Sequence, residues 1–410
     1  MSGCDTEQGL ISVDQALDLI LHETKALKTE QLMLNQALYR YLAEDVYSKI
    51  NLPIFAQSAV DGYAICAQSV IEEDTEFELI GEIRAGQQAA VSLKAEQAVR
   101  IFTGAPIPTG TTTVARQEIV HRGNSTCIKV EKNLSLDVDI RHAGEEITCG
   151  QLLAEQGQYL SVGAIASLGM AGIQTVEVFC YPKVAVVITG DEVAENIEDL
   201  ASGKIFDANT PLIHVWFQQA GHSVDIIHVE DSAAAVKTLL QSLSEHYDLI
   251  LSTGGISVGD YDFIRPAALD SGFQQIFWKV KQKPGKPMFF ARQRREDGSH
   301  CYLLGLPGNP AAVYVGMQVY VSTLLFALQG QQQQPHWITA ILTHDLKPDE
   351  RERFLRMSLT VDQATLKVTS LSKQQSHMLS NLMQANALVR VPAATAIHAG
   401  QIVKVLLIQG

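Results

Sequence analysis

The segment Ser252–Arg265 concentrates chemically useful groups in a short loop. It reads Ser-Thr-Gly-Gly-Ile-Ser-Val-Gly-Asp-Tyr-Asp-Phe-Ile-Arg and follows the apolar run Tyr247–Leu251, which predicts a buried strand. Glycines allow a ligand to approach the backbone and leave N–H groups for an anion. Carboxylates in the same loop suit a hard cation such as Mg²⁺. The segment therefore predicts a site for a phosphorylated, nucleotide-like ligand with a divalent metal.

The same segment also matches a different enzyme pattern. Gly255–Gly259 reads G-x-S-x-G, the nucleophile elbow of serine hydrolases, with Ser257 as the nucleophile. That chemistry needs a base histidine later in the chain. The later histidines lie beyond residue 335, except His300, which falls in an expected hairpin tip. Asp260–Asp262 also interrupts the position where the elbow helix should begin, so a serine hydrolase is the minor alternative.

An acidic pair ends another expected strand. Val187–Val193 reads Val-Ile-Thr-Gly-Asp-Glu-Val, which places Asp191 and Glu192 at the carboxyl end of a buried strand. Ligands bind at this edge of parallel sheets, so both carboxylates are candidate ligand contacts. The structural alternative is that Asp191 merely caps the next segment.

Four lysines occupy Phe277–Pro287 of this acidic chain, namely Lys279, Lys281, Lys283 and Lys286. Alternation along a strand predicts the first three on one face. Such a run is usually a solvated edge. The Pro-Gly-Lys-Pro sequence at its end instead indicates a fixed loop that directs a cation toward an anion. Leu304–Pro310 then ends another strand, and Gly308 and Asn309 can offer N–H groups where a helix begins.

Two loops in the first half of the chain carry less specific signals. Asp61-Gly62 is a common turn pair, and Arg100–Gly110 has the composition of a rigid Gly/Pro connector. In the functional alternative, the Thr103 hydroxyl and the Gly104 N–H face a ligand.

Strands alternating with helices over residues 183–327 must position these loops. The pattern predicts a mostly parallel sheet with right-handed crossovers, whose strand ends carry the loops. Asn209 or Thr210 is the expected N-cap of a helix with Pro211 at its first helical position. The expected strands cover 183–188, 224–229 and 248–251, and the expected helices cover 210–220, 233–244 and 311–316.

The remaining segments have other rhythms. Residues 12–45 are expected to be helical from a Ser12 cap, and 46–145 alternate as short strands. Residues 146–180, with a helix over 162–168, are expected to return and pack on the first helix. The Gln-rich stretch 329–335 is an expected linker, followed by a small β-barrel or sandwich.

Bulk properties exclude several classes of protein. The 410 residues carry a formal charge of −14, which argues against nonspecific binding to nucleic acid or anionic membrane. None of the six cysteines forms C-x-x-C, so neither a zinc site nor a redox pair is indicated. We expect no apolar run of transmembrane length and no signal peptide, and therefore a cytoplasmic protein.

Taken together and in order, these motifs resemble the molybdopterin molybdenumtransferase family, to which the E domain of gephyrin belongs. The resemblance covers nearly the whole chain. The matching segments are Pro53–Ala64, Arg100–Gly110 with Gln117-Glu118, Gly144–Gly150, Thr189–Glu192, Asp207–Asn209, Ser252–Asp262, Lys283–Pro287 and Leu306–Pro310.

The resemblance implies a multidomain α/β plus β fold. Its centre would be a three-layer α/β molybdopterin-binding domain over residues 181–328. The other parts would be a discontinuous helical and extended domain (1–45 and 146–180), an inserted β-rich domain (46–145) and a C-terminal β-barrel (335–410). A homodimer is also implied, with the cleft between the α/β domain of one subunit and the inserted domain of the other.

The implied reaction takes molybdate and adenylylated molybdopterin, uses Mg²⁺ and releases AMP. Its implied catalytic residues are Asp61, Thr103, Glu192, Asp231 and Asp262, with Asp61, Glu192 and Asp262 as metal ligands. Ser257 would be a contacting hydroxyl. The implied binding residues are Gly190, Asp191, Ser252, Gly254, Gly255, Ser257, Gly259, Lys279, Lys283, Lys286, Pro307, Gly308 and Asn309.

The sequence departs from the family at Gly110–Thr113, which lacks the usual acid, and at Glu146, where the family usually has Asp. Two other functions remain open: a non-catalytic carrier or scaffold for molybdopterin intermediates, and a molybdopterin adenylyltransferase. Implied partners are the pathway's adenylyltransferase and proteins that mature molybdoenzymes.

Overall fold

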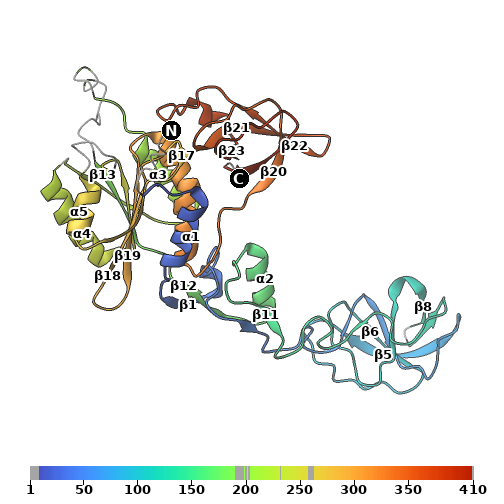
Figure 1. Cartoon of the computed structure of the whole chain (residues 1–410). Coiled ribbons are helices and arrows are strands. Elements are labelled where there is room, and N and C mark those ends of the chain that lie inside the picture. The colour runs from blue at the N-terminus through green and yellow to red at the C-terminus, as the bar shows by residue number, and fades with distance from the viewer. Residues whose placement is uncertain are drawn as a thin grey trace. The chain divides into compact units, whose positions relative to one another are not determined.

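The computed structural model describes residues 9–124, 126–189, 198, 201, 204–230, 232–256 and 263–408. They belong to two compact units, one formed by residues 31–178 and one formed by the chain before and after that segment. Figure 1 shows the elements of both. The division of the chain into four domains stays a prediction.

A six-stranded sheet organises the larger unit. Its first four strands run parallel, and the last two are antiparallel to their neighbours. The predicted mostly parallel sheet is therefore confirmed. In spatial order the strands are β14 (Asp225–Val229), β13 (Val184–Thr189), β15 (Leu249–Thr253), β19 (His300–Leu306), β18 (Phe289–Arg294) and β16 (Gln274–Trp278).

Helices cover both faces of this sheet and make a three-layer domain. In Figure 1, α4 (Ala233–His246) and α5 (Ile264–Asp270) lie on one side, with α1 (Val13–Glu23) and α3 (Asn209–Gln219) on the other. Two apolar clusters correspond to the two faces. All five residues of β15 are buried, as expected for a strand covered on both faces.

The first helix is shorter than expected. Ser12 caps it through a capping box with Gln15, but it ends at Glu23 rather than near residue 45. Strand β1 (Thr29–Met33) follows with alternating exposure, a period of two that no helix can satisfy. The buried face of α1 packs against α7 (Ser322–Leu328) in the core of the α/β sheet.

One core helix corrects the expectation about apolar runs. Residues 310–328 are helical throughout, as α6 (Pro310–Gly316), a π-helical segment η4 (Met317–Val321) and α7. This helix is long and apolar enough to cross a membrane, but 78% of it is buried inside the protein. A core helix passes the same test, so the finding is weak evidence for a membrane span.

The predicted C-terminal β-barrel is confirmed. Its strands are ordered β21-β22-β20-β24-β23, and β21 also pairs with β23 to close the ring. The two-residue strand β17 (Gln282–Lys283) pairs with the start of β21. The barrel strands are β20 (Ile338–Leu342), β21 (Glu352–Asp362), β22 (Thr365–Ser370), β23 (Ala387–Val391) and β24 (Ile402–Leu407).

The Gln-rich stretch before the barrel is partly fixed. Gln329 and Gln331 are buried, and the Gln329 side-chain amide donates to the Leu325 carbonyl at 3.1 Å. These contacts extend the order of α7 into the expected linker.

The second unit carries the predicted strand-rich segment. Six strands form one sheet with an apolar cluster on each face. Helix α2 (Val162–Met170) belongs to a third cluster with Leu34 and Leu42. The sheet order is β7 (Thr113–Arg116), β4 (Gly62–Ile65), β6 (Gln97–Ile101), β5 (Glu76–Ile83), β9 (Cys127–Val130) and β8 (Val120–Asn124).

Candidate active site

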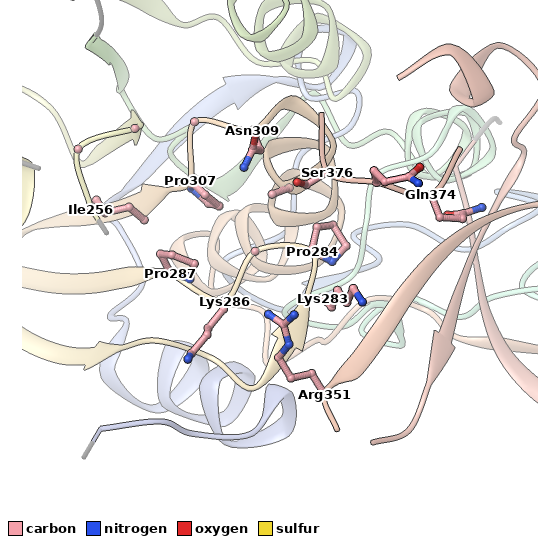
Figure 2. A pocket seen from close by; sticks show the side chains of 16 residues that line it. Ile256, Lys283, Pro284, Lys286, Pro287, Pro307, Asn309, Arg351, Gln374 and Ser376 are labelled. Atoms are coloured by element: carbon pink, nitrogen blue, oxygen red, sulfur yellow. The ribbon is translucent and has the colours of Figure 1, made fainter. Parts of the chain in front are cut away.

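A cavity of about 360 Å³ lies at the carboxyl edge of the parallel strands. Its walls are the loops after β15 and β19, the loop 283–287, and residues of the barrel (Figure 2). In that view Lys286 and Arg351 lie along one side, across from Pro307 and Asn309. The edge is where ligands bind in open α/β sheets.

Two backbone loops without bulky side chains form one wall. Gly254 and Gly255 have positive φ values of 87° and 64°, a conformation that favours glycine. The Gly254 N–H donates to the Leu306 carbonyl at 2.9 Å, which ties the β15 loop to β19. A Cβ added at Gly308 would lie 3.7 Å from the Gly254 Cα, so the two loops touch. The wall therefore offers backbone groups to a ligand.

Ser252 supports this wall from behind. It is fully buried, does not line the cavity, and its Oγ has no hydrogen-bond partner in the described part of the chain. The structure thus places Ser252 beneath the site that the sequence predicted it would contact.

The start of α3 orients the Pro-Gly-Asn turn. The Asn209 side-chain amide donates to the Gly308 carbonyl at 2.9 Å. Asp207 accepts from the N–H groups of Asn209 at 2.8 Å and Thr210 at 3.1 Å, so it caps the helix in place of the expected Asn209 or Thr210. Aspartate side chains commonly accept from the backbone N–H two residues later, in an Asx-turn. This tendency could have identified Asp207 as the capping residue from the sequence.

Lys283 is held at the cavity by a carboxylate of the barrel. Its ammonium lies 3.0 Å from Asp349 Oδ2. Asp349 also accepts from the Arg351 N–H at 3.1 Å, and this bond, followed by that of Lys283, holds the pKa of Asp349 below its ordinary value. An ordered ammonium beside the Arg351 side chain suits an anionic ligand.

A buried amide fixes the loop that carries Lys283 and Lys286. Gln282 is fully buried, and its Nε2 donates to the Pro284 carbonyl at 3.1 Å and to the Gly285 carbonyl at 3.2 Å. Its Oε1 accepts from the Tyr320 hydroxyl, which comes from η4. The Pro-Gly-Lys-Pro sequence therefore forms a fixed loop with Lys286 in the cavity wall.

Lys279 lies outside this cavity. It has a φ of 76°, and its ammonium lies 4.2 Å from the centre of the Trp278 ring. Regular strand ends at Trp278 and resumes at Gln282, so the predicted alternation that would align Lys279 with Lys283 is wrong. The Trp278 indole N–H donates to the Ile256 carbonyl at 3.0 Å, which links this aromatic ring to the glycine loop.

The barrel contributes lining residues that the sequence analysis missed: Arg351, Gln374, Gln375 and Ser376. The guanidinium of Arg356, only 2% exposed, holds their loop. It donates to the carbonyls of Lys373 at 3.1 Å, Gln375 at 3.2 Å and Met378. Burial lowers the pKa of Arg356 from its ordinary value. An arginine within the apolar strand Phe354-Leu-Arg-Met is a signal of such a buried contact.

Asp61 and Thr103 form a separate pair in the unit of residues 31–178. The Asp61 carboxylate accepts from the Thr103 N–H at 2.9 Å and from its hydroxyl at 2.8 Å. These two bonds, the backbone one first, lower the pKa of Asp61. Both residues are exposed, and the pair presents a carboxylate that stays ionised in neutral solution.

Several predicted residues lie outside the described part of the chain: Gly190, Asp191, Glu192, Asp231, Ser257, Gly259 and Asp262. Within the described residues, no three His, Cys, Asp or Glu side chains gather as a metal site. The described lining of the cavity also contains no carboxylate. This lining fits an anion and supplies no carboxylate to a divalent cation.

The geometry also bears on the serine-hydrolase alternative. Strand β19 runs parallel to β15 with Leu306 opposite Thr253, so His300 begins β19 at the far edge of the sheet from the glycine loop. No histidine is among the described residues that line the cavity. The described site thus lacks the base that a serine nucleophile requires.

Known proteins match nearly the whole length of the chain. Family models match at residues 11–172 (MoeA N-terminal region, domain I and II), 185–327 (probable molybdopterin binding domain) and 339–408 (MoeA C-terminal region, domain IV). A molybdopterin molybdenumtransferase of Staphylococcus epidermidis is 33% identical over 406 residues, covering 97% of this chain and 95% of its own.

Two further similarities agree with these. A molybdopterin molybdenumtransferase of Haemophilus influenzae is 33% identical over 389 residues, covering 93% of this chain and 94% of its own. The crystal structure of a molybdopterin biosynthesis moeA protein from Pyrococcus horikoshii OT3 superimposes with a TM-score of 0.82 at 26% identity, over 97% of this chain and all of that one.

Proposed function

Because this chain belongs to the molybdopterin molybdenumtransferase family, we propose that it inserts molybdenum from molybdate into adenylylated molybdopterin and releases AMP. The family relationship makes the protein a transferase of molybdenum cofactor biosynthesis. The assignment of molybdate and adenylylated molybdopterin as its substrates is our proposal. The chemistry of the cavity supports this assignment.

The main support for this proposal is that glycine-containing loops and cationic side chains line the same cavity. Gly254, Gly255 and Gly308 offer close backbone approach, while Lys283, Lys286 and Arg351 supply positive charge. Cleavage of a phosphoanhydride requires that charge on its oxygens be neutralised and that the reacting groups be held in position. Cations on a fixed loop meet both requirements.

In this proposal the cavity residues bind and orient the adenylylated substrate. Lys283 and Lys286 attract its phosphate oxygens, and Gln282 keeps their loop from moving away. The Asn209 contact with Gly308 holds the opposite wall. The buried Arg356 keeps residues 374–376 at the rim of the cavity.

Magnesium dependence remains part of the proposal, with Asp61, Glu192 and Asp262 as the predicted ligands. A bound Mg²⁺ would neutralise phosphate oxygens at the bond that breaks. The described cavity lining offers it no carboxylate, so the roles given above for this chain's residues do not depend on it.

The test supplies purified protein with adenylylated molybdopterin and molybdate, with and without Mg²⁺. We expect AMP release that depends on molybdate, together with cofactor that activates a molybdenum-free apo-enzyme. The proposal is wrong if the protein binds the substrate but releases no molybdate-dependent AMP.

The same assay separates the two other functions. A carrier would deliver added cofactor to the apo-enzyme without releasing AMP. An adenylyltransferase would instead consume ATP and molybdopterin and form the adenylylated product. Asp61→Asn should abolish AMP release by the insertase and leave delivery by a carrier unchanged.

A homodimer is a second part of the proposal. In the proposed dimer the partner subunit covers exposed apolar side chains of the α/β unit, among them Ile205, Phe206 and Val215, which are 61%, 55% and 57% exposed. Light scattering on the purified chain should give twice the mass of one chain at micromolar concentration. A monomer mass at that concentration would reject the dimer.

A further inference from the structure

A second cavity, of about 490 Å³, lies at the other edge of the parallel sheet. It is formed by the segment after α1, the residues before β13, the turn 295–299 and the start of β19. Seven residues of β19 separate this edge from the first cavity, roughly 20 Å of extended strand. The volume lies within the range of small-molecule sites.

Positive charge dominates the lining of this second cavity. Four cationic side chains, those of Lys25, Lys28, Lys183 and Arg295, face two carboxylates. This balance runs opposite to the −14 charge of the whole chain. A local excess of cations in an acidic protein concentrates anions at that place.

The two carboxylates are already engaged. Asp248 accepts from the Lys183 N–H at 3.0 Å and lies 3.5 Å from the Arg295 guanidinium. Asp297 accepts from the N–H and the hydroxyl of Ser299 at 2.9 and 2.6 Å. The two Ser299 bonds, followed by the charges of Lys28 and Arg295, lower the pKa of Asp297, so both carboxylates are shared among several partners.

Within the described part of the chain, the ammonium groups of Lys25, Lys28 and Lys183 make no hydrogen bond or ion pair. Their backbone is nevertheless fixed. The Lys25 N–H donates to the Tyr302 hydroxyl at 2.7 Å, and the Lys28 carbonyl accepts from the Cys180 N–H at 2.9 Å. Three ammonium groups without a hydrogen bond or ion pair in the described residues thus belong to an ordered stretch of backbone.

The pKa of His300 reflects the positive electrostatic potential of the second cavity. Burial, and then the charges of Lys25, Arg292, Arg294 and Arg295, lower its pKa below the ordinary value. Its ring stacks on Tyr302 with 6.0 Å between the centres. Glu23 is paired with Arg292 and with His22 rather than with His300. The imidazole is therefore neutral near pH 7 and surrounded by positive charge.

We propose that this second cavity binds a small phosphorylated molecule through Lys25, Lys28 and Lys183. Ammonium groups act as point charges for phosphate oxygens, and a ligand with at least two negative charges would complement the lysines. This site is independent of the proposed reaction, because it shares no lining residue with the first cavity.

The test follows the ring signals of His300 by NMR in the full-length protein with labelled histidine. The signal is identified by its loss in His300→Gln. Titration with inorganic pyrophosphate at constant ionic strength should move this signal and reach saturation. The variant Lys28→Gln/Lys183→Gln should bind at least about tenfold more weakly, since two of the three ammonium groups are lost.

Two controls make the result specific. Lys94→Gln/Lys132→Gln removes the same charge from exposed positions of the other unit and should leave the titration unchanged. Lys283→Gln, which alters the first cavity, should also leave it unchanged. The proposal is overturned if sodium chloride alone reproduces the shift, or if the Lys28/Lys183 variant titrates like the unmodified protein.

The pH dependence gives an independent readout. A bound anion stabilises the imidazolium form and therefore raises the pKa of His300. By linkage, pyrophosphate should bind more tightly as the pH falls toward that pKa. Equal pKa values for His300 with and without saturating pyrophosphate would contradict binding beside it.

Discussion

At the scale of single residues, hydrogen bonds from Thr103 lower the pKa of Asp61. The carboxylate accepts a backbone and a side-chain bond from Thr103, and both favour its ionised form. Because the folded pKa is lowered, these bonds contribute above the ordinary pKa of aspartate and are lost as the pH falls through the lowered value. The turn should loosen only in acid.

Replacing Thr103 with valine tests this coupling. Thr103→Val removes the hydroxyl and keeps the backbone bond, so we expect the pKa of Asp61 to rise part of the way toward its ordinary value. Carboxyl-carbon NMR titration measures the midpoint. An unchanged midpoint would show that the hydroxyl bond is unimportant for the ionisation of Asp61.

Lys283 should affect activity more than stability. Its ion pair with Asp349 is half exposed, and such pairs contribute about 0–1 kcal/mol to folding. We expect Lys283→Gln to lower the rate of AMP release at least about tenfold, as loss of a cation at a phosphate does. The melting temperature should change little. Lys281→Gln, an exposed neighbour, is the matched control, and equal losses in both would contradict the assignment.

At the scale of elements, Gly62 in β4 is required by close packing. A Cβ at this position would lie 2.0 Å from the Ala115 carbonyl oxygen on the neighbouring strand β7. The backbone of β7 can shift only at a high energetic cost, because it is fixed within the sheet. Gly62→Ala should therefore destabilise the unit of residues 31–178 by about 2–3 kcal/mol. Gly123→Ala, where nothing lies within 4 Å, should stay within about 0.5 kcal/mol in the same urea titration.

Replacement of Arg356 should destabilise the barrel through the loss of buried hydrogen bonds. Arg356→Met fills a similar volume but leaves the carbonyls of Lys373, Gln375 and Met378 without their donor. We expect a loss of about 2–4 kcal/mol and faster proteolysis within 372–379, since unsatisfied buried acceptors are costly. Proteolysis unchanged in that loop would mean that other contacts hold it.

The periodic elements were predictable because each followed one local pattern. The alternation over 183–327 predicted the parallel sheet, and the glycine and proline loops predicted where the cavity lies. The contribution of the barrel to the cavity lining was not predictable from the sequence. Arg351 and Gln374 lie at the cavity because β17 pairs with β21, a contact between segments far apart in the chain. The short α1 and the irregular segment at Lys279 likewise depend on tertiary contacts that override local pattern.

At the scale of the whole molecule, residues 31–178 enter and leave the other unit at adjacent points. The Cys180 N–H donates to the Lys28 carbonyl at 2.9 Å, so a short Gly-rich linker can replace the entire segment. We expect the shortened protein to fold and to bind AMP in the first cavity. It should release no AMP from substrate, because Asp61 and Thr103 are gone.

Circular dichroism and calorimetric titration of AMP check the shortened protein. Its control is the same deletion with Lys283→Gln, which should weaken AMP binding. An aggregated or unfolded product would show that residues 31–178 are required by the rest of the chain.

The strand pairing between β17 and β21 has a consequence for how such chains can recombine. Three family models match successive parts of the chain, and the last of them covers residues 339–408. These boundaries suggest that recombination between relatives could exchange the C-terminal segment as a unit. A crossover near residue 335 would separate Lys283 from its inherited Asp349 and Gln282–Lys283 from its strand partner. Crossovers near residues 30 and 179 would instead fall within β1 and its partner strand β12 (Thr175–Phe179). The α/β sheet and the barrel should therefore be inherited together.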